Sequence, residues 1–567
     1  MLSFLRCALA VLLIGFSAAL PRPASADEAP VSMNAAQIRL ALEKLNVLGR
    51  VLYVAAHPDD ENTGLIAFWA NASLYDAAYL SLTRGDGGQN LIGPELGDQL
   101  GVIRTQELLA ARRIDGGRQF FTRANDFGFS KSSAETLRIW DREKILADTV
   151  WAIRKFRPDV IVTRFPADDD KTHGHHTASA QLAQEAFKIA ADPKRFPEQL
   201  KFVQPWQPTR LLWNSSSFFF RARNIPFDPT GLILLEAGGY QPLLGKSYAE
   251  IDAASRTMHK SQGFGVSIER GEQKEYFKFL EGQPVEKENL FSGIDTTWSR
   301  VPKASGLSEK IQTVLAGYDV KQPAASVARL LELRKSLKDL DFEFWAREKL
   351  ADVEGLIAAC LGLHLEVASE KIAAQPGENL AFQLEAINRS AVPVKWKSLR
   401  LLGDETAVDA ALPEGTLVTR KASVRLPETL PFTQPYWLRD AGTAGTFAVG
   451  DQTLIGLPEN PPAFAVEFTI EVGGQDIVYR LEPRFRKVDR VEGETSKPLV
   501  IAPPVFVELP RPVFVFGNSD PKTLNVRVIS SSEKVTGQIA LEAPHGWEVE
   551  PPAAPVELYG LESETTC

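Results

Sequence analysis

The stretch Val-Leu-Tyr-Val-Ala-Ala-His-Pro-Asp-Asp-Glu, residues 51–61, decides the fold of the first half of the chain. Its first six residues form a short apolar run of the kind that fills a buried strand. Pro58 cannot donate a hydrogen bond to a sheet, so we expect the strand to end near His57. Apolar residues at helical spacing follow from 65 to 69, which predicts a helix that starts near Asp60 or Glu61.

One imidazole and three carboxylates therefore follow this strand directly: His57, Asp59, Asp60 and Glu61. In open α/β sheets, ligands bind at the carboxyl ends of the strands. The stretch has the composition of a metal site, with at least one carboxylate that metal binding does not require.

Further apolar runs at 77–82, 160–162 and 211–213 alternate with helical patterns at 102–111, 141–156 and 178–190. Strands that alternate with helices are typical of a parallel sheet with crossover helices on both faces. We therefore predict an α/β domain with a mostly parallel sheet.

The pattern of apolar and polar residues changes after this domain, and 567 residues are too many for one hydrophobic core. We expect the α/β domain over 27–300 and a helical segment over 301–363. Short alternating runs then predict a β-sandwich over 364–492, and a proline-rich link leads to a second β-rich domain over 499–567. Because this last domain has few strands, we expect it to be incomplete or to borrow strands from a partner.

The first 26 residues have the pattern of a signal peptide. Arg6 precedes an apolar run from 7 to 20, and Ala24-Ser-Ala26 suits a cleavage site. The alternative is a membrane anchor, for which the run is short. No later stretch is long and apolar enough to span a bilayer, and no basic run interleaved with aromatic residues suggests nucleic acid. We expect an exported protein, periplasmic or extracellular, with no transmembrane segment after signal removal.

Histidine is scarce, and four of the seven fall in two short stretches, His57 and residues 173–176. Both stretches follow strand-like runs, so in a parallel sheet they can open on the same edge. A hydrolytic zinc site needs three protein ligands and one open position. His57, Asp60 and His176 supply that set, with His175 expected to point away from the metal. Iron(II) or cobalt would also suit these ligands, because affinity alone does not choose the metal.

Two further groups fit the chemistry of hydrolysis. Asp59 is placed to take a proton from a metal-activated water. His173, preferably cationic, is placed to stabilise an oxyanion or to protonate a departing amine. Taken singly, each residue has a structural interpretation, such as a capping carboxylate or a polar loop. The metal interpretation is favoured because two scarce clusters coincide at two strand ends.

Other patterns are weaker. The loop Thr-Arg-Gly-Asp-Gly-Gly over 83–88 lacks the Lys-Ser/Thr of a P-loop, so a tight turn at the sheet edge is preferred to a phosphate site. Arg104 and Glu107 lie three residues apart on a predicted helix, where a solvated ion pair is the structural interpretation. His259 ends a predicted helix, and either a helix terminus or a substrate-facing wall suits it.

The motif Ala-His-Pro-Asp-Asp-Glu over 56–61 resembles the signature of the PIG-L/LmbE-like zinc N-deacetylases. The resemblance covers residues 48–215 well and implies a Rossmann-like fold. It implies zinc ligation by His57, Asp60 and His176, with Asp59 as general base and His173 as the assisting histidine. The second motif reads His-Gly-His-His here, whereas many members have His-Pro-Asp-His.

The resemblance also implies substrate contacts. Arg104 and Glu107 fall where the family has an Arg/Glu-bearing helix near the substrate, and Asp126 resembles a residue that contacts a sugar hydroxyl.

The function implied is that of a secreted zinc-dependent hydrolase. It would remove N-acetyl groups from an N-acetylglucosamine-containing or related amino-sugar or glycan substrate. Two alternatives remain open at this point: a zinc amidase that acts on another amide, and a glycan-binding surface protein whose deacetylase-like domain is inactive.

Overall fold

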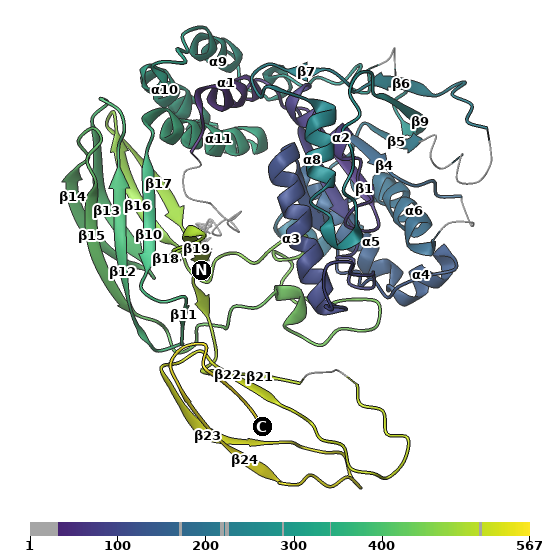
Figure 1. The fold of residues 1–567 in the computed structure, drawn as a ribbon. Helices are drawn as coiled ribbons and strands as arrows, with labels where there is room; N and C mark the ends of the chain where they lie inside the picture. The colour runs from purple at the N-terminus through teal and green to yellow at the C-terminus, as the bar shows by residue number, and fades with distance from the viewer. Residues whose placement is uncertain are drawn as a thin grey trace, which may run out of the picture.

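A computed structural model describes residues 32–168, 173–215, 220, 226–285, 289–340, 342–509 and 513–567 (Figure 1). The predicted signal peptide, residues 1–26, lies outside this part of the chain. No helix among the described residues has both the length and the apolar character needed to cross a membrane.

A seven-stranded sheet forms the centre of the first half of the chain, in the order β3-β2-β1-β4-β5-β9-β6. The first four pairings along this order are parallel, and β9 pairs antiparallel with both β5 and β6. The prediction of a mostly parallel sheet is confirmed. The strands are β1 (Arg50–Ala55), β2 (Asp76–Ser81), β3 (Arg118–Phe121), β4 (Val160–Thr163), β5 (Arg210–Ser215), β6 (Ile233–Glu236) and β9 (Lys274–Gly282).

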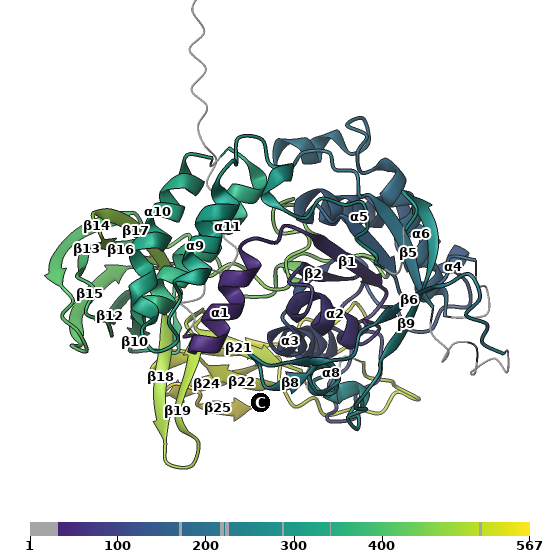
Figure 2. The same cartoon turned by 90° about the horizontal axis from the view of Figure 1, so that it is seen from above.

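Helices cover both faces of this sheet, so β1 is buried on both sides (Figures 1 and 2). Leu52 and Val54 share a core with α5 and α6, whereas Val51 and Tyr53 share one with α2 and α3. The helices of this domain are α2 (Thr63–Asn71), α3 (Asp98–Asp115), α4 (Ser133–Ile139), α5 (Arg142–Phe156), α6 (Gly174–Ile189) and α8 (Tyr248–Arg256), with a short hairpin of β7 (Tyr240–Gln241) and β8 (Lys246–Ser247).

A helical layer joins the α/β domain to the β-rich half. It consists of α9 (Leu307–Ala316), α10 (Val327–Lys338) and α11 (Phe344–Leu361), together with α1 (Ala35–Lys44) from the beginning of the described chain. Ile38 and Leu42 of α1 lie in the same core as Ile311 and Leu356. Although the sequence interpretation placed α1 in the α/β domain, its apolar face packs on the helical segment.

The next segment forms two facing sheets, ordered β15-β12-β10-β18-β19 and β14-β13-β16-β17. Phe382 and Leu384 of the first share a core with Trp396 and Phe468 of the second, and that core continues into the helical layer. The strands are β10 (His364–Ser369), β12 (Asn379–Ile387), β13 (Val394–Leu401), β14 (Asp404–Ala411), β15 (Val418–Arg425), β16 (Val466–Val472), β17 (Gln475–Leu481), β18 (Arg484–Asp489) and β19 (Gly493–Pro498).

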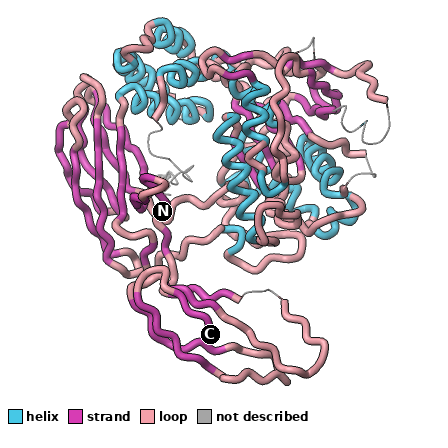
Figure 3. Tube along the Cα trace, in the orientation of Figure 1, coloured by secondary structure: helices cyan, strands magenta, loops and turns pink. Residues whose placement is uncertain are grey.

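The last segment is dominated by strands and loops (Figure 3). A three-stranded and a two-stranded sheet enclose a small core of Val528, Val556 and Leu558. A short parallel pair of β11 (Ala373–Ala374) and β20 (Val500–Ile501) ties it to the sandwich. Its strands are β21 (Val505–Glu508), β22 (Arg527–Ser530), β23 (Lys534–Ala540), β24 (Ala553–Tyr559) and β25 (Glu564–Thr566).

One long connection between strands of the sandwich extends away from it. Residues 426–465, between β15 and β16, run to the α/β domain and are here named the strap (Figure 1). The backbone N–H of Asn125 donates to the carbonyl of Gly445 at 3.0 Å, and Thr446 forms a β-bridge with Ala124. The strap therefore lies along the β3 edge of the central sheet.

Candidate metal centre

The loop between β1 and α2 forms the base of the site. The backbone N–H of His57 donates to Oδ2 of Asp60 at 2.8 Å, and the N–H of Asp60 donates back to the carbonyl of His57 at 3.2 Å. The helix starts at Thr63 and not near Asp60, because the side chain of Asn62 accepts the N–H of Leu65 as its N-cap. The later start leaves residues 56–62 free to form the loop.

His57, Asp60 and His176 converge as the sequence interpretation requires. Nδ1 of His57 lies 3.0 Å from Oδ2 of Asp60, and Nε2 of His176 lies 3.6 Å from Oδ1 of Asp60. One potential ligand atom from each of the three lies within 4.8 Å of the others. His176 reaches this point from the first turn of α6, which begins at the carboxyl edge of the sheet. The structure thus brings the two distant stretches together, and ligation by them stays a prediction.

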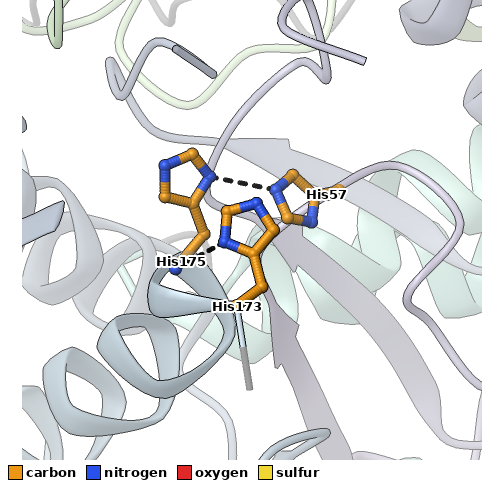
Figure 4. A group of neighbouring side chains, drawn as sticks. All are labelled: His57, His173 and His175. Carbon is orange, nitrogen blue, oxygen red and sulfur yellow. Dashed lines mark hydrogen bonds between the residues drawn. The ribbon is translucent and has the colours of Figure 1, made fainter. Parts of the chain in front are cut away.

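His175 does not point away from this cluster, contrary to the expectation. Its Nδ1 lies 3.1 Å from Nε2 of His57, and its own backbone N–H donates to Nδ1 of His173 at 3.2 Å (Figure 4). The side chain is fully buried beside Trp140 and Phe127. His57 therefore presents one ring nitrogen to Asp60 and the other to His175.

The ligand candidates differ in their protonation states. Burial opposes ionisation of Asp60, but the charges of His176 and His57 outweigh it and hold the pKa of Asp60 below its usual value. Burial lowers the pKa of His176 to about 3. Burial also opposes the charged form of His57, but the charges of Asp60 and Asp126 outweigh it and raise the pKa of His57 to about 8, so a metal ion would displace a proton from that ring. An ionised carboxylate beside a neutral imidazole is the state in which these side chains bind a metal. The donor chemistry of the set therefore fits zinc.

His173 is also held neutral. Burial, aided by the charge on His57, lowers the pKa of His173 to about 4. The cationic form expected from the sequence is thus disfavoured near neutral pH. Because Nδ1 accepts the N–H of His175, the ring proton of neutral His173 resides on Nε2, where it can be donated.

Asp59 occupies a strained position next to the ligand set. Its backbone φ is +108°, a conformation that costs a non-glycine residue energy and that concentrates at functional sites. Three hydrogen bonds hold it: its N–H donates to Oε2 of Glu61 at 2.9 Å, its Oδ2 accepts from Nη2 of Arg104 at 2.9 Å, and its carbonyl oxygen accepts from Nη1 of Arg256 at 3.4 Å. Burial raises the pKa of the Asp59 carboxyl to about 6, against the opposing charge of Arg104.

Arg104 and Glu107, both predicted to contact substrate, are buried and bonded within the protein. Arg104 donates to the carbonyls of Pro58 and Gly85 as well as to Asp59. Glu107 accepts both the backbone N–H and the hydroxyl of Ser261 at 2.7 Å. In this structure the two residues shape the site's wall, and a direct contact of either with substrate stays a prediction.

Asp126, the third predicted substrate contact, follows β3 and faces the histidines. Its Oδ2 lies 3.8 Å from Nε2 of His57, and its Oδ1 lies 3.6 Å from Nδ1 of His175. The backbone N–H of Gly128 donates to Oδ1 at 3.0 Å and fixes the carboxylate. Asp126 is thus part of the site, behind His57.

The glycine-rich loop after β2 is a turn, as preferred, but it also packs against the site. A Cβ atom at Gly85, where φ is +71°, would lie 2.3 Å from Nη1 of Arg104. A Cβ atom at Gly87 would lie 2.3 Å from the carbonyl oxygen of Asp126. The two glycines let the backbone approach Arg104, which contacts Asp59, and Asp126, which lies beside His57.

Sequence reasoning missed a buried network behind the motif. Oε1 of Glu61 lies 2.8 Å from Nε2 of His259 and 3.2 Å from Nη2 of Arg112. His259, left open between two interpretations, is fully buried just after α8 and therefore anchors the motif loop. The signal was present in Glu61 as the last residue of the motif, but its partners lie about 50 and 200 residues away.

Part of the chain is similar to known proteins. Residues 52–187 match the family PIG-L, described as GlcNAc-PI de-N-acetylase. A mycothiol S-conjugate amidase of Streptomyces coelicolor is 27% identical over 225 residues, which cover 37% of this chain and 74% of the relative. A 1D-myo-inositol 2-acetamido-2-deoxy-alpha-D-glucopyranoside deacetylase of Rhodococcus jostii is 34% identical over 189 residues, which cover 29% of this chain and 60% of the relative.

A solved N,N'-diacetylchitobiose deacetylase of Pyrococcus horikoshii is similar over 38% of this chain and 70% of that protein, with 18% identity and a TM-score of 0.27. The matches to the deacetylases of Kineococcus radiotolerans and Thermobispora bispora span only 56% and 57% of those relatives.

Proposed function

We propose, on the premise that residues 52–187 form a PIG-L domain of the GlcNAc-PI de-N-acetylase family, that this chain is a zinc-dependent N-deacetylase. Its substrate would be an N-acetylglucosamine-containing or related amino sugar, and its products acetate and the free amine. The observation that carries the proposal is the convergence of His57, Asp60 and His176 with Asp59 beside them.

His57, Asp60 and His176 would hold the zinc ion through two imidazole nitrogens and a carboxylate oxygen. When bound, zinc supplies Lewis-acid chemistry, which polarises a carbonyl and makes a coordinated water easier to deprotonate. The remaining steps fall to side chains of the chain itself.

Asp59 is the general base of this proposal. It accepts one proton from the attacking water as the water oxygen bonds to the acetamide carbon. Arg104 fixes the orientation of the carboxylate through Oδ2, and the strained backbone sets the direction in which it points. The base is therefore in place before substrate binds.

His173 faces the ligand histidines, with ring centroids 5.2 Å from those of both His57 and His176. Its Nε2–H would donate a hydrogen bond to the oxygen on which negative charge develops. When the C–N bond breaks, the nitrogen takes the proton held by Asp59 and leaves as the amine. This assignment needs neutral His173, which the burial of the ring favours.

We propose that the chain is exported, on the signal-peptide pattern of its first 26 residues. Fractionation of the native host, with an antibody against the mature chain, tests this. Retention in the cytosol with residues 1–26 intact contradicts it.

A second candidate function is the hydrolysis of a different amide by the same groups. The similarity to the Streptomyces coelicolor amidase favours it, since that relative is matched over 74% of its length. A glycan-binding protein with an inactive domain is disfavoured, because the proposed ligands, base and oxyanion donor are all present and lie together.

The test is acetate release from a panel of monomeric, oligomeric and polymeric N-acetylglucosamine compounds, measured on the purified chain. We expect release from part of the panel, its loss on treatment with chelator, and its return with zinc. Cleavage of other amides with no acetate release from any amino sugar supports the amidase. No hydrolysis of either kind by zinc-loaded protein contradicts both.

A further inference from the structure

The strap contacts two loops of the α/β domain that lie beside the metal centre. One is the loop after β2, which contains Arg84 and Gly85, and the other is the segment after β3, which leads to Asp126. The strap brings its own small core, formed by Tyr436, Trp437 and Phe447, to this surface.

Arg84 makes the first connection and is only 1% exposed. Its guanidinium donates to the strap carbonyls of Leu457 and Pro458, each at 3.0 Å, and to the hydroxyl of Tyr436 at 3.2 Å. Its Cζ also lies 3.4 Å from the centroid of the Trp437 ring. A buried arginine with this many partners is fixed in one orientation.

Arg84 is linked to the proposed base, Asp59, through the backbone of the next residue, Gly85. The carbonyl of Gly85 accepts Nη1 of Arg104 at 3.0 Å, and Nη2 of the same guanidinium donates to Oδ2 of Asp59 at 2.9 Å. A displacement of the loop after β2 would therefore move the group that orients Asp59.

The second connection runs through backbone atoms. Phe447 donates its N–H to the carbonyl of Arg123 at 2.8 Å, and Asn125 donates its N–H to the carbonyl of Gly445 at 3.0 Å. The next residue is Asp126, whose carboxylate lies behind His57. The strap thus adds a backbone segment to the β3 edge just before a site residue.

We propose that the strap positions the catalytic loops, so that the β-sandwich acts in the reaction through Arg84, Gly85 and the 123–126 segment. This inference rests on the proposed function. The sandwich would then be more than a spacer, because a spacer requires no contact with the loops of the metal centre. Tyr436 and Gly445 of the strap are positioning residues, since they act on Asp59 and Asp126 through other groups.

Two glycines of the strap give a matched pair of variants. A Cβ atom at Gly445 would lie 1.9 Å from the carbonyl oxygen of Ile139, so Gly445→Ala must push the strap away from α4. A Cβ atom at Gly450 has no heavy atom within 4 Å, so Gly450→Ala adds the same methyl group without displacement. Tyr436→Phe, which removes the hydroxyl that contacts Arg84, serves as a milder variant if Gly445→Ala does not fold.

The experiment measures hydrogen exchange of residues 83–88 and 122–128 in the full chain, together with zinc content, kcat and KM. In Gly445→Ala we expect faster exchange in both loops, retained zinc and a kcat lower by about ten- to a hundredfold, since small misplacements of reacting groups are costly. Gly450→Ala should match the parent. Tyr436→Phe should change in the same direction, by less.

The inference is overturned if Gly445→Ala exchanges like the parent, if its loops loosen while kcat is unchanged, or if Gly450→Ala shows the same losses. The exchange measurement requires no turnover. If the parent hydrolyses no amide, the proposed function fails, whereas unchanged loop exchange in the variants contradicts the strap's role by itself.

Discussion

The described part of the chain contains two clusters of histidine and carboxylate that differ in what surrounds them. In the α/β domain, His57, Asp60 and His176 meet at a sheet edge, and the nearby cation Arg104 pairs with Asp59. In the sandwich, a second cluster also lies within 4.8 Å, formed by His364, Glu366 and Glu385. There Arg486 lies 3.1 Å from Glu366 and 3.2 Å from Glu385.

The difference shows that proximity of ligand atoms does not by itself make a metal site. A guanidinium already pairs with both carboxylates of the sandwich cluster, and a metal ion would have to displace it. In the α/β cluster, by contrast, burial keeps His176 neutral while Asp60 stays ionised, and the carboxylate faces two imidazoles. We therefore expect the first cluster to bind zinc and the second to be an ion pair network.

Removal of His57 should have the largest effect on the α/β cluster and so test its difference from the sandwich cluster most directly. His57→Ala deletes a proposed ligand that also contacts His175, so we expect loss of bound zinc and acetate release at background level. Elemental analysis and the acetate assay measure the two effects. His545→Ala, which changes an exposed histidine of the last segment, is the control. Full zinc occupancy in His57→Ala would refute the ligand assignment.

Removal of the base should separate binding from chemistry. Asp59→Asn keeps the shape of the side chain but cannot accept a proton, so we expect kcat to fall by about 10²–10⁴-fold. Zinc content should remain that of the parent, because Asp59 is outside the proposed ligand set. Steady-state kinetics and elemental analysis check both points. A variant that loses zinc along with activity would make Asp59 a ligand and not the base.

The network behind the motif should give a smaller effect. His259→Ala removes one partner of buried Glu61, which holds the N–H of Asp59. We expect kcat to fall by about ten- to a hundredfold, as for other groups that orient a metal site. Unfolding in urea should show a loss of about 1–3 kcal/mol, the cost of a buried group that loses a partner.

A conservative variant tells positioning from stability in this network. His259→Gln retains a donor for Glu61 and should recover part of kcat. If His259→Gln is as slow as His259→Ala although its stability is restored, the hydrogen bond to Glu61 does not position the base.

The sequence was sufficient where the chemistry lies in short segments. The apolar run before His57 predicts the strand, and the rule that parallel strands end at one edge predicts that residues 57 and 176 meet. The motif has little conformational freedom, because the side chains of Asp60 and Glu61 accept hydrogen bonds from backbone N–H groups only two or three residues away. Local spacing was therefore enough to locate the cluster.

The orientation of His175 and the partners of His259 could not be predicted in this way. They depend on groups that lie more than a hundred residues away, His57 and Glu61 respectively. The strap was also missed, because its contacts with Arg84 span more than 350 residues and involve backbone carbonyls that any sequence supplies. Patterns of side-chain type carry no signal for such contacts.

The smallest expected effect is in the sandwich cluster. His364→Ala removes a side chain that is 40% exposed and lies 3.5 Å from Glu366. Because Arg486 remains bonded to both carboxylates, zinc content and kcat should equal those of the parent within error. Titration of the parent with zinc should accordingly reach one ion per chain. A second ion that disappears in His364→Ala would show that a metal can displace the guanidinium, and the distinction between the two clusters would then rest on affinity alone.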